Sequence, residues 1–201
     1  MSTAADRRFP QIPEEKLTPE QRAIVDDIRA GPRSKLSTSS ASKPGPIGGP
    51  FNVMLRSPVI GMLIQKLGGE IRFNSIISGK LNELAILITA RHYMANYEWN
   101  AHCKLALKGG LDPAIAQAIA EGREPAGMDA DEALVYEFSK SLHNNHGVSD
   151  ELFERAKARF GERGIVDIIA VNGYYSLVSF LLNVDKTPLP AGVEPALKPL
   201  K

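Results

Sequence analysis

Signals that start α-helices recur along this chain of 201 residues. Thr18, Ser57 and Asp112 are each followed directly by proline, which is favoured at the first helical position because the N–H that it lacks has no helical partner there. Asp129 begins a capping box that Glu132 completes three residues later. Apolar residues at helical spacing follow these starts, and no alternating strand pattern is evident. The sequence therefore predicts an all-α fold.

The helices that these patterns predict cover residues 18–31, 57–73, 81–91, 97–108, 112–122, 129–143, 149–161 and 165–184. Gly68 and Gly69 weaken the second of them, which either breaks there or runs on to Phe73. The helix over 81–91 is apolar almost all round, so we expect it to be buried. Asn96 is expected to cap the helix over 97–108. Whether these two form one bent helix or two stacked helices stays open.

The composition along the chain predicts three segments. Residues 1–50 hold an N-terminal helix and, from 32 to 50, a linker rich in Ser, Pro and Gly that has almost nothing to bury. Residues 51–186 form the compact helical domain. The tail over 187–201 contains four prolines, and we expect it to wrap a neighbour or stay loose.

The charge and the cysteine usage narrow the class of protein. A net charge of +1 gives no reason to expect nucleic acid or an anionic membrane as a partner. The most apolar run, over 84–90, is too short to span a bilayer, and the N-terminus lacks the apolar stretch of a secretory signal. Cys103 is the single cysteine, which excludes an internal disulfide. We therefore expect a cytoplasmic protein without a membrane or nucleic-acid partner.

Glu98 and His102 are the first candidates for chemistry. They stand four residues apart, so on a helix they share one face. A carboxylate raises the proton affinity of a neighbouring imidazole, and such a pair can hand over one proton and take another back. The alternative is a Glu–His contact on the protein surface that contributes little to stability.

Glu83 is the second candidate, because it lies within the apolar segment over 81–91. A buried carboxylate must find a partner or stay protonated. It could form a structural salt bridge with Arg91, two turns later, or take part in a proton relay. The sequence leaves both readings open.

The remaining candidates are weaker. His143 and His146 have a spacing that suits two metal ligands, but a third ligand is not evident, so we predict no metal site. We expect His143 to carry a positive charge at a helix C-terminus. His92 could face the same pocket as Tyr97. Cys103 has no second thiol with which to cycle and is expected to be a small buried residue.

Several stretches resemble the carboxymuconolactone decarboxylase family, which shares its fold with the alkylhydroperoxidase D proteins. The resemblance rests on residues 82–87, 97–102 and 106–111, and 172–178 is similar to the closing helix of that family. The resemblance as a whole extends over about residues 51–185.

Peroxidase members of this group carry a Glu, then a Cys-x-x-Cys and then a His. Carried over to this chain, the Glu falls on Glu83 and the His on His102, whereas the two cysteines fall on Ala95 and Glu98. Both thiols are missing, so the resemblance makes hydroperoxide reduction implausible. Decarboxylase-like members have a glutamate four residues before the histidine, as Glu98 is here.

The resemblance implies an all-helical subunit of a homotrimer or homohexamer. It further implies a cofactor-independent enzyme that decarboxylates or isomerises a small carboxylated or lactone-bearing metabolite, such as those of aromatic catabolism. Glu83, Glu98 and His102 would be catalytic, and Tyr97 and Arg91 would bind the substrate. The alternatives are a non-catalytic oligomer with a structural Glu/His network, and a thiol-based redox role for Cys103 through an intermolecular partner.

Overall fold

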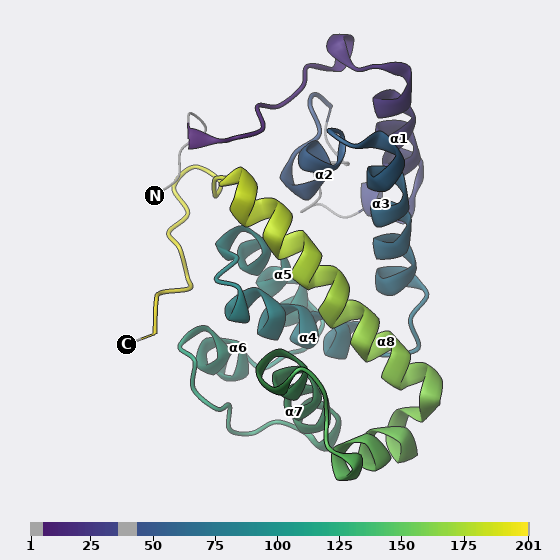
Figure 1. The fold of residues 1–201 in the computed structure, drawn as a ribbon. Helices are drawn as coiled ribbons and strands as arrows, with labels where there is room; N and C mark the ends of the chain where they lie inside the picture. The colour runs from purple at the N-terminus through teal and green to yellow at the C-terminus, as the bar shows by residue number, and fades with distance from the viewer. Residues whose placement is uncertain (1–5, 36–43, 201) are drawn as a thin grey trace. The chain divides into compact units, whose positions relative to one another are not determined.

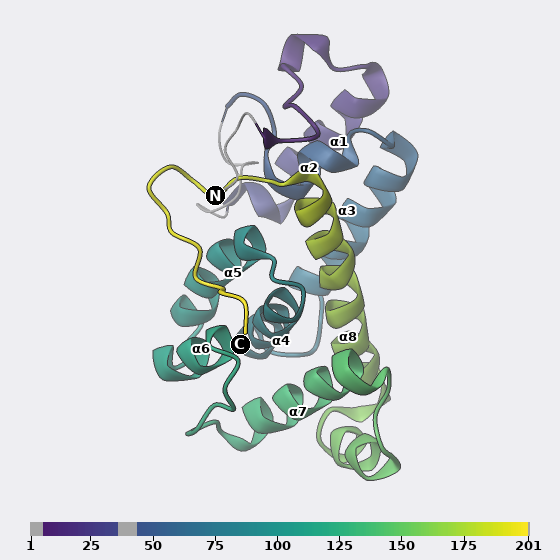
Figure 2. The ribbon, with the colours of Figure 1, turned by 60° about the vertical axis from the view of Figure 1, so that its left-hand side comes forward.

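The computed structural model describes residues 6–35 and 44–200. Within these ranges the secondary structure is helical and no strand is present, which confirms the predicted all-α class (Figures 1 and 2). The chain divides into two compact units. The first comprises the residues up to Asn74 together with Leu181–Pro188, and the second comprises Ser75–Phe180 together with Leu189–Lys201.

The first unit contains α1 (Pro19–Ala30), α2 (Gly49–Met54) and α3 (Pro58–Phe73), with short 3-10 turns at Glu14–Lys16 and Pro32–Lys35. Its core is an aliphatic cluster formed by Ile24, Val25, Ile28, Ile47 and Leu55. The segment over 32–50 was expected to be a loop, yet it holds a 3-10 turn at its start and the beginning of α2 at its end. Residues 36–43 lie outside the described part of the chain.

Local sequence accounts for how α1 and α3 form. The capping box at α1 is present, because Thr18 accepts a hydrogen bond from the Gln21 N–H and the Gln21 side chain accepts one from the Thr18 N–H. Gly68 and Gly69 do not break α3, which runs uninterrupted to Phe73. Gly61 is needed where α3 passes α2, since a Cβ at this position would overlap the carbonyl of Met54.

The second unit contains α4 (Gly79–His92), α5 (Asn96–Lys108), α6 (Pro113–Ala120), α7 (Ala130–Asn145) and most of α8 (Asp150–Asp185). The predicted apolar helix is α4, and it packs against α5, α6 and α7. A turn with Met94 at φ 54° separates α4 from α5, so these are two helices rather than one bent helix.

α8 is a pair of helices joined at a kink. Gly161 has φ 68° inside the element, a left-handed conformation that glycine adopts without a steric penalty. The two helices predicted over 149–161 and 165–184 are therefore present and are continuous with each other. By length and composition α8 could also cross a membrane, but half of its most apolar window is buried within the protein, as in a core helix.

The prediction that Asn96 caps α5 is wrong. Ala95 takes the N-cap position, and Asn96 is the first helical residue. The Asn96 side chain instead binds the tail: its Nδ2 donates to the Leu197 carbonyl at 3.2 Å, and its Oδ1 accepts from the Leu197 N–H at 2.8 Å. Leu197 is buried, so this part of the tail packs on its own chain and is not loose.

A buried ion pair secures the first unit. The Asp185 side chain is fully buried and accepts hydrogen bonds from Arg7, from the Phe9 N–H and from the Thr187 hydroxyl. Burial raises the pKa of the Asp185 carboxyl, but the hydrogen bonds outweigh this effect and hold the pKa below its ordinary value. Asp185 therefore stays ionised, and Arg7 depends on it for charge compensation.

Asp185→Asn should lower the free energy of unfolding by about 3 kcal/mol, because it leaves the Arg7 charge buried without a counter-ion. Urea unfolding followed by circular dichroism measures this loss. Glu137→Gln is the matched control, since it removes an exposed ion pair with Arg155 and should change stability far less. Equal stability losses in the two variants would contradict the structural role of Asp185.

Candidate functional site

The second unit brings three of the predicted residues together. Glu83 lies on α4, and Glu98 and His102 lie one turn apart on α5. Nδ1 of His102 is 2.6 Å from Oε2 of Glu83, and Nε2 is 2.9 Å from Oε1 of Glu98. The imidazole is therefore held at both nitrogens between two carboxylates that come from different helices. We call these three residues the Glu–His–Glu triad.

The triad is almost completely removed from solvent. The side chains of His102, Glu83 and Glu98 are 6, 12 and 5% exposed. An ionised carboxylate can only accept hydrogen bonds, so two carboxylate partners require both ring nitrogens to donate. Burial alone lowers the pKa of His102, but the charges and hydrogen bonds of Glu83 and Glu98 outweigh it and raise that pKa to about 9. His102 is therefore an imidazolium at neutral pH.

Tyr175 packs on the triad, although no role was predicted for this residue. Its ring meets the His102 ring edge-on with the centroids 5.0 Å apart, and only 2% of the residue is exposed. An aromatic wall beside an imidazole restricts its rotation and keeps water away. The only signal for this contact was that Tyr175 falls in the stretch similar to the closing helix of the family, which does not predict a partner.

The two predicted substrate-binding residues take different places. Tyr97 is half-buried in the first turn of α5, next to Glu98. Arg91 donates from Nη1 to the Lys198 carbonyl at 2.8 Å and contacts the sulfur of Met94. The salt bridge considered between Glu83 and Arg91 is therefore wrong, because Glu83 pairs with His102 and Arg91 binds the tail.

A second set of buried polar side chains contacts His143, which lies in the last turn of α7, at the C-terminal end where the sequence placed it. Its Nε2 is 3.0 Å from both Oγ1 of Thr89 and Oδ1 of Asn172. The Asn172 amide is fixed, because its Nδ2 donates to Ser139 and to the carbonyl of Ile168. Oδ1 must then accept, so Nε2 of His143 carries the proton.

The prediction that His143 carries a positive charge is wrong. Burial and the neighbouring His92 lower the pKa of His143 to about 4, so the ring is neutral at pH 7. No group of His, Cys, Asp and Glu side chains in residues 6–35 and 44–200 is arranged to hold a metal ion. Cys103 is half-buried, and burial raises the pKa of its thiol, which disfavours the reactive thiolate.

Comparison with known proteins identifies the fold. No family model matches the chain, and no curated protein matches it. An uncharacterized peroxidase-related protein from Silicibacter sp. TM1040 has a TM-score of 0.66 at 15% identity, covering 92% of this chain and 91% of that one. A variant of the debrominase Bmp8 in complex with 2,3,4-tribromopyrrole has a TM-score of 0.68 at 12% identity, covering 95 and 94%. The chain has an alkylhydroperoxidase-like fold, and at these identities the likeness shows the fold alone.

The two histidines should differ in charge at pH 7, His102 being positive and His143 neutral. The His102 ring should give the nitrogen shifts of an imidazolium, because two carboxylates compensate its charge. The His143 ring should give those of a neutral imidazole protonated at Nε2. A ¹⁵N NMR titration, assigned with His102→Gln and His143→Gln, measures both. A neutral His102 at pH 7 would refute the charge assignment of the triad.

The raised pKa of His102 also predicts how stability depends on pH. Since the pKa in the folded state, about 9, lies above the ordinary value of 6.5, the contribution of His102 is fully present below pH 6.5 and is lost as the pH rises through 9. The shift corresponds to about 3 kcal/mol. Urea unfolding from about pH 6 to about pH 10 covers both the ordinary and the folded-state pKa of His102 and should show this decline in the natural protein. His102→Gln should flatten it, and an unchanged slope would contradict the prediction.

Proposed function

We propose that this protein is a cofactor-independent enzyme that moves protons on a small carboxylated or lactone-bearing metabolite. The observation that carries the proposal is the imidazolium of His102 held between Glu83 and Glu98. The fold also occurs in a debrominase, so an enzymatic role is compatible with it. The triad is the part of the second unit that offers an acid and two bases in one chain of hydrogen bonds.

The arrangement favours proton transfer through Glu98. Both nitrogens of His102 are engaged, so the ring does not meet the substrate itself. The imidazolium gives its Nε2 proton to Glu98, and Glu98 passes a proton to the substrate. The neutral ring keeps its Nδ1 proton in the hydrogen bond to Glu83, and a proton taken up by Glu98 from the substrate or from solvent later returns to Nε2. His102 and Glu83 are therefore positioning and reloading groups, and Glu98 is the catalytic residue.

This relay suits decarboxylation, isomerisation or ring opening. In a decarboxylation the bond between the carboxyl carbon and its neighbour breaks, and the adjoining carbonyl accepts the electron pair. A protonated Glu98 then protonates the carbon. An isomerisation needs the same group first as base and then as acid. Tyr97, next to Glu98 and half-buried, would orient the substrate.

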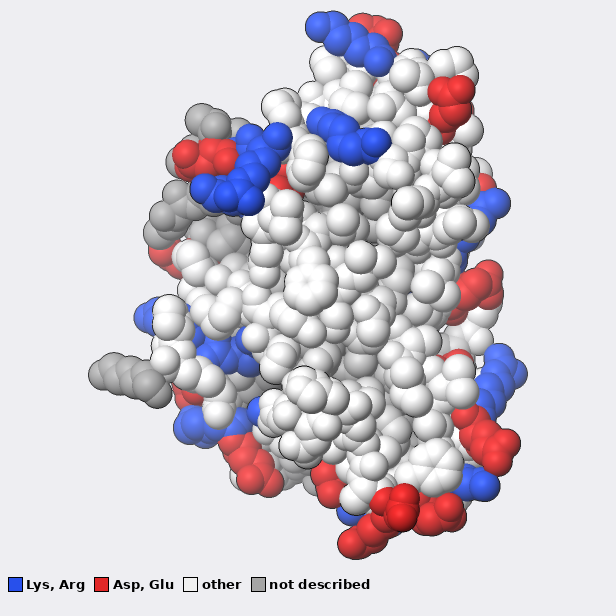
Figure 3. All heavy atoms as spheres, in the orientation of Figure 1, with Lys and Arg blue, Asp and Glu red and all other residues white. Residues whose placement is uncertain are grey.

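The proposal includes a homo-oligomer, in line with the family resemblance. Within the second unit, α8 exposes a row of apolar side chains at helical spacing: Val166, Ile169, Leu177 and Phe180. Figure 3 shows uncharged atoms over α8 where it crosses the view. Exposed apolar surface of this kind marks a site of protein association, and a trimer or hexamer of this chain would cover it.

A structural role for the triad is the competing function. A buried ion network of this kind could merely tie α4 to α5, and its loss would then lower stability without affecting any reaction. A redox role for Cys103 has less support, because burial raises the pKa of that thiol. The structural alternative predicts that the triad variants keep full turnover, and the redox alternative predicts that Cys103→Ser is inactive, so the same assay separates all three.

Glu98→Gln and His102→Gln should each lower turnover by roughly a hundredfold, because general acid–base groups contribute on this scale. The assay follows release of carbon dioxide and uptake of solvent deuterium with 4-carboxymuconolactone and a panel of small β-keto acids and lactone acids. Cys103→Ser is the matched control, since it changes the residue next to His102 and should keep full activity.

Three results would overturn the proposal. No turnover of any compound by the natural protein would remove the enzymatic reading. Full turnover in both triad variants would show that the triad is only structural. Loss of activity in Cys103→Ser with intact Glu98→Gln would favour the thiol.

A further inference from the structure

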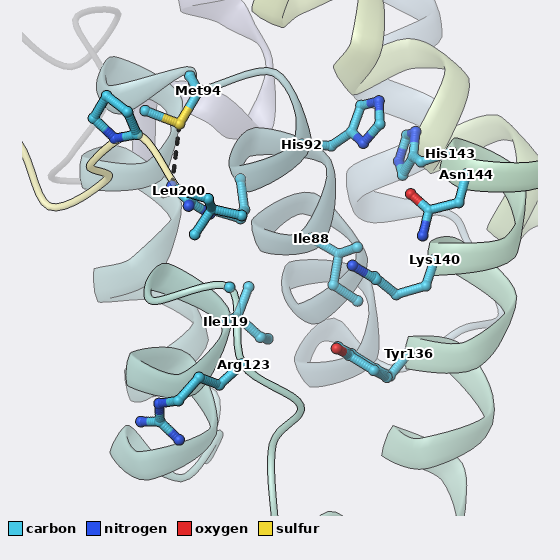
Figure 4. Close-up of a pocket in the computed structure, with 13 residues that line it drawn as sticks. Ile88, His92, Met94, Ile119, Arg123, Tyr136, Lys140, His143, Asn144 and Leu200 are labelled. Atoms are coloured by element: carbon cyan, nitrogen blue, oxygen red, sulfur yellow. Dashed lines mark hydrogen bonds between the residues drawn. The ribbon is translucent and has the colours of Figure 1, made fainter.

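A second site lies in the second unit, away from the triad. A cavity of about 380 Å³ opens between α4, α6, α7 and the C-terminal tail (Figure 4). Glu83, Glu98 and His102 are not among its lining residues. Its volume falls in the range of cavities that hold small molecules. It therefore needs an explanation of its own.

The cavity combines an apolar body with positive charge. Ile88, Ile119, Met94 and Leu200 supply apolar surface, and Arg91, Arg123 and Lys140 supply cations. None of its lining residues is acidic. Figure 4 shows Lys140 and Tyr136 extending from α7 toward Ile88. Arg123 is already paired with Glu121, which leaves Arg91 and Lys140 as the charges that a ligand could use.

Arg91 is the strongest pointer to a ligand. The residue is only 8% exposed, and its Nη2 is buried without a hydrogen-bond partner. A buried guanidinium nitrogen in this state carries a substantial desolvation penalty. Arg91 belongs to the lining of the cavity, so an anion that reaches this nitrogen from the cavity side would remove that penalty. Guanidinium groups bind carboxylates in a two-pronged geometry, and Nη1 is already fixed by the Lys198 carbonyl.

His143 adds a hydrogen-bond acceptor. Its Nε2 is bound to Thr89 and Asn172 and carries the proton, so Nδ1 holds a lone pair. His143 lines the cavity, and its ring stacks on that of His92 with the centroids 4.8 Å apart. A ligand with a hydroxyl group can donate to this nitrogen, whereas a metal site is not arranged here.

The C-terminal tail closes one wall of the cavity. Pro199 and Leu200 belong to the lining, and Leu200 lies directly against Gly122. The tail is held in place by Arg91 through Lys198 and by Asn96 through Leu197. The cavity therefore depends on the same arginine that would bind the anion, which couples ligand binding to the position of the tail.

We propose that this cavity binds a small hydroxylated organic acid. Its carboxylate pairs with Arg91 and Lys140, and its hydroxyl donates to Nδ1 of His143. Its apolar body packs on Ile88 and Ile119. The proposal does not depend on the proposed function, because the cavity shares no lining residue with the triad.

Isothermal titration with 4-hydroxybenzoate tests the proposal, with 4-hydroxybenzamide as the neutral probe of the same shape. The acid should bind saturably, and the amide at least about tenfold more weakly because it lacks the charge. Lys140→Gln, an exposed change that should leave the fold intact, should weaken binding of the acid about threefold. Arg91→Gln should weaken it by about thirtyfold or more.

Lys157→Gln is the matched control, since Lys157 is an exposed lysine outside the cavity. It should leave affinity unchanged. The ¹⁵N signals of His143 should move on titration while those of His102 stay in place. Absence of saturable binding, equal affinity for acid and amide, or full affinity in Lys140→Gln would each overturn the proposal. Movement of the His102 signals alone would place the acid at the triad and would overturn it as well.

Discussion

A buried positive charge must be compensated where it stands, and in this protein that requirement joins α4 to α5. His102 lies almost fully out of water, so its imidazolium persists only because Glu83 and Glu98 meet its two nitrogens. One acid comes from the neighbouring helix and the other from one turn earlier on its own helix. The geometry of the triad therefore depends on how α4 and α5 pack, and that packing in turn depends on the apolar faces of α4.

The same unit holds a second histidine, His143, whose ring is neutral. The hydrogen-bond partners of His143, Thr89 and Asn172, are neutral. Burial lowers the pKa of its ring, and no neighbouring carboxylate offsets that effect, so the ring is neutral. Two histidines of one unit thus differ in charge, because His102 has two carboxylate partners and His143 has none. The triad holds an acid ready for proton transfer, whereas His143 presents a lone pair to a cavity with a cationic lining.

The sequence predicted what depends on local spacing. Caps, prolines and apolar periodicity placed the helices, and the four-residue spacing placed Glu98 beside His102. The pairing of Glu83 with His102 is a contact between helices, and only the family pattern pointed to it. The contacts of Tyr175, Asn96 and Arg91 depend on tertiary packing. Asn96 has the composition of a cap, but a long-range pair of hydrogen bonds to Leu197 competes with capping and wins.

If the triad acts as one proton relay, the effects of Glu98 and His102 on turnover are coupled, and a double-mutant cycle measures that coupling. Glu98→Gln, His102→Gln and the double variant are compared on the best substrate of the acid and lactone panel. Groups that act as a unit lose their effect together, so the double variant should be no slower than the slower single variant. Losses that multiply would show that Glu98 and His102 act separately and would contradict the relay.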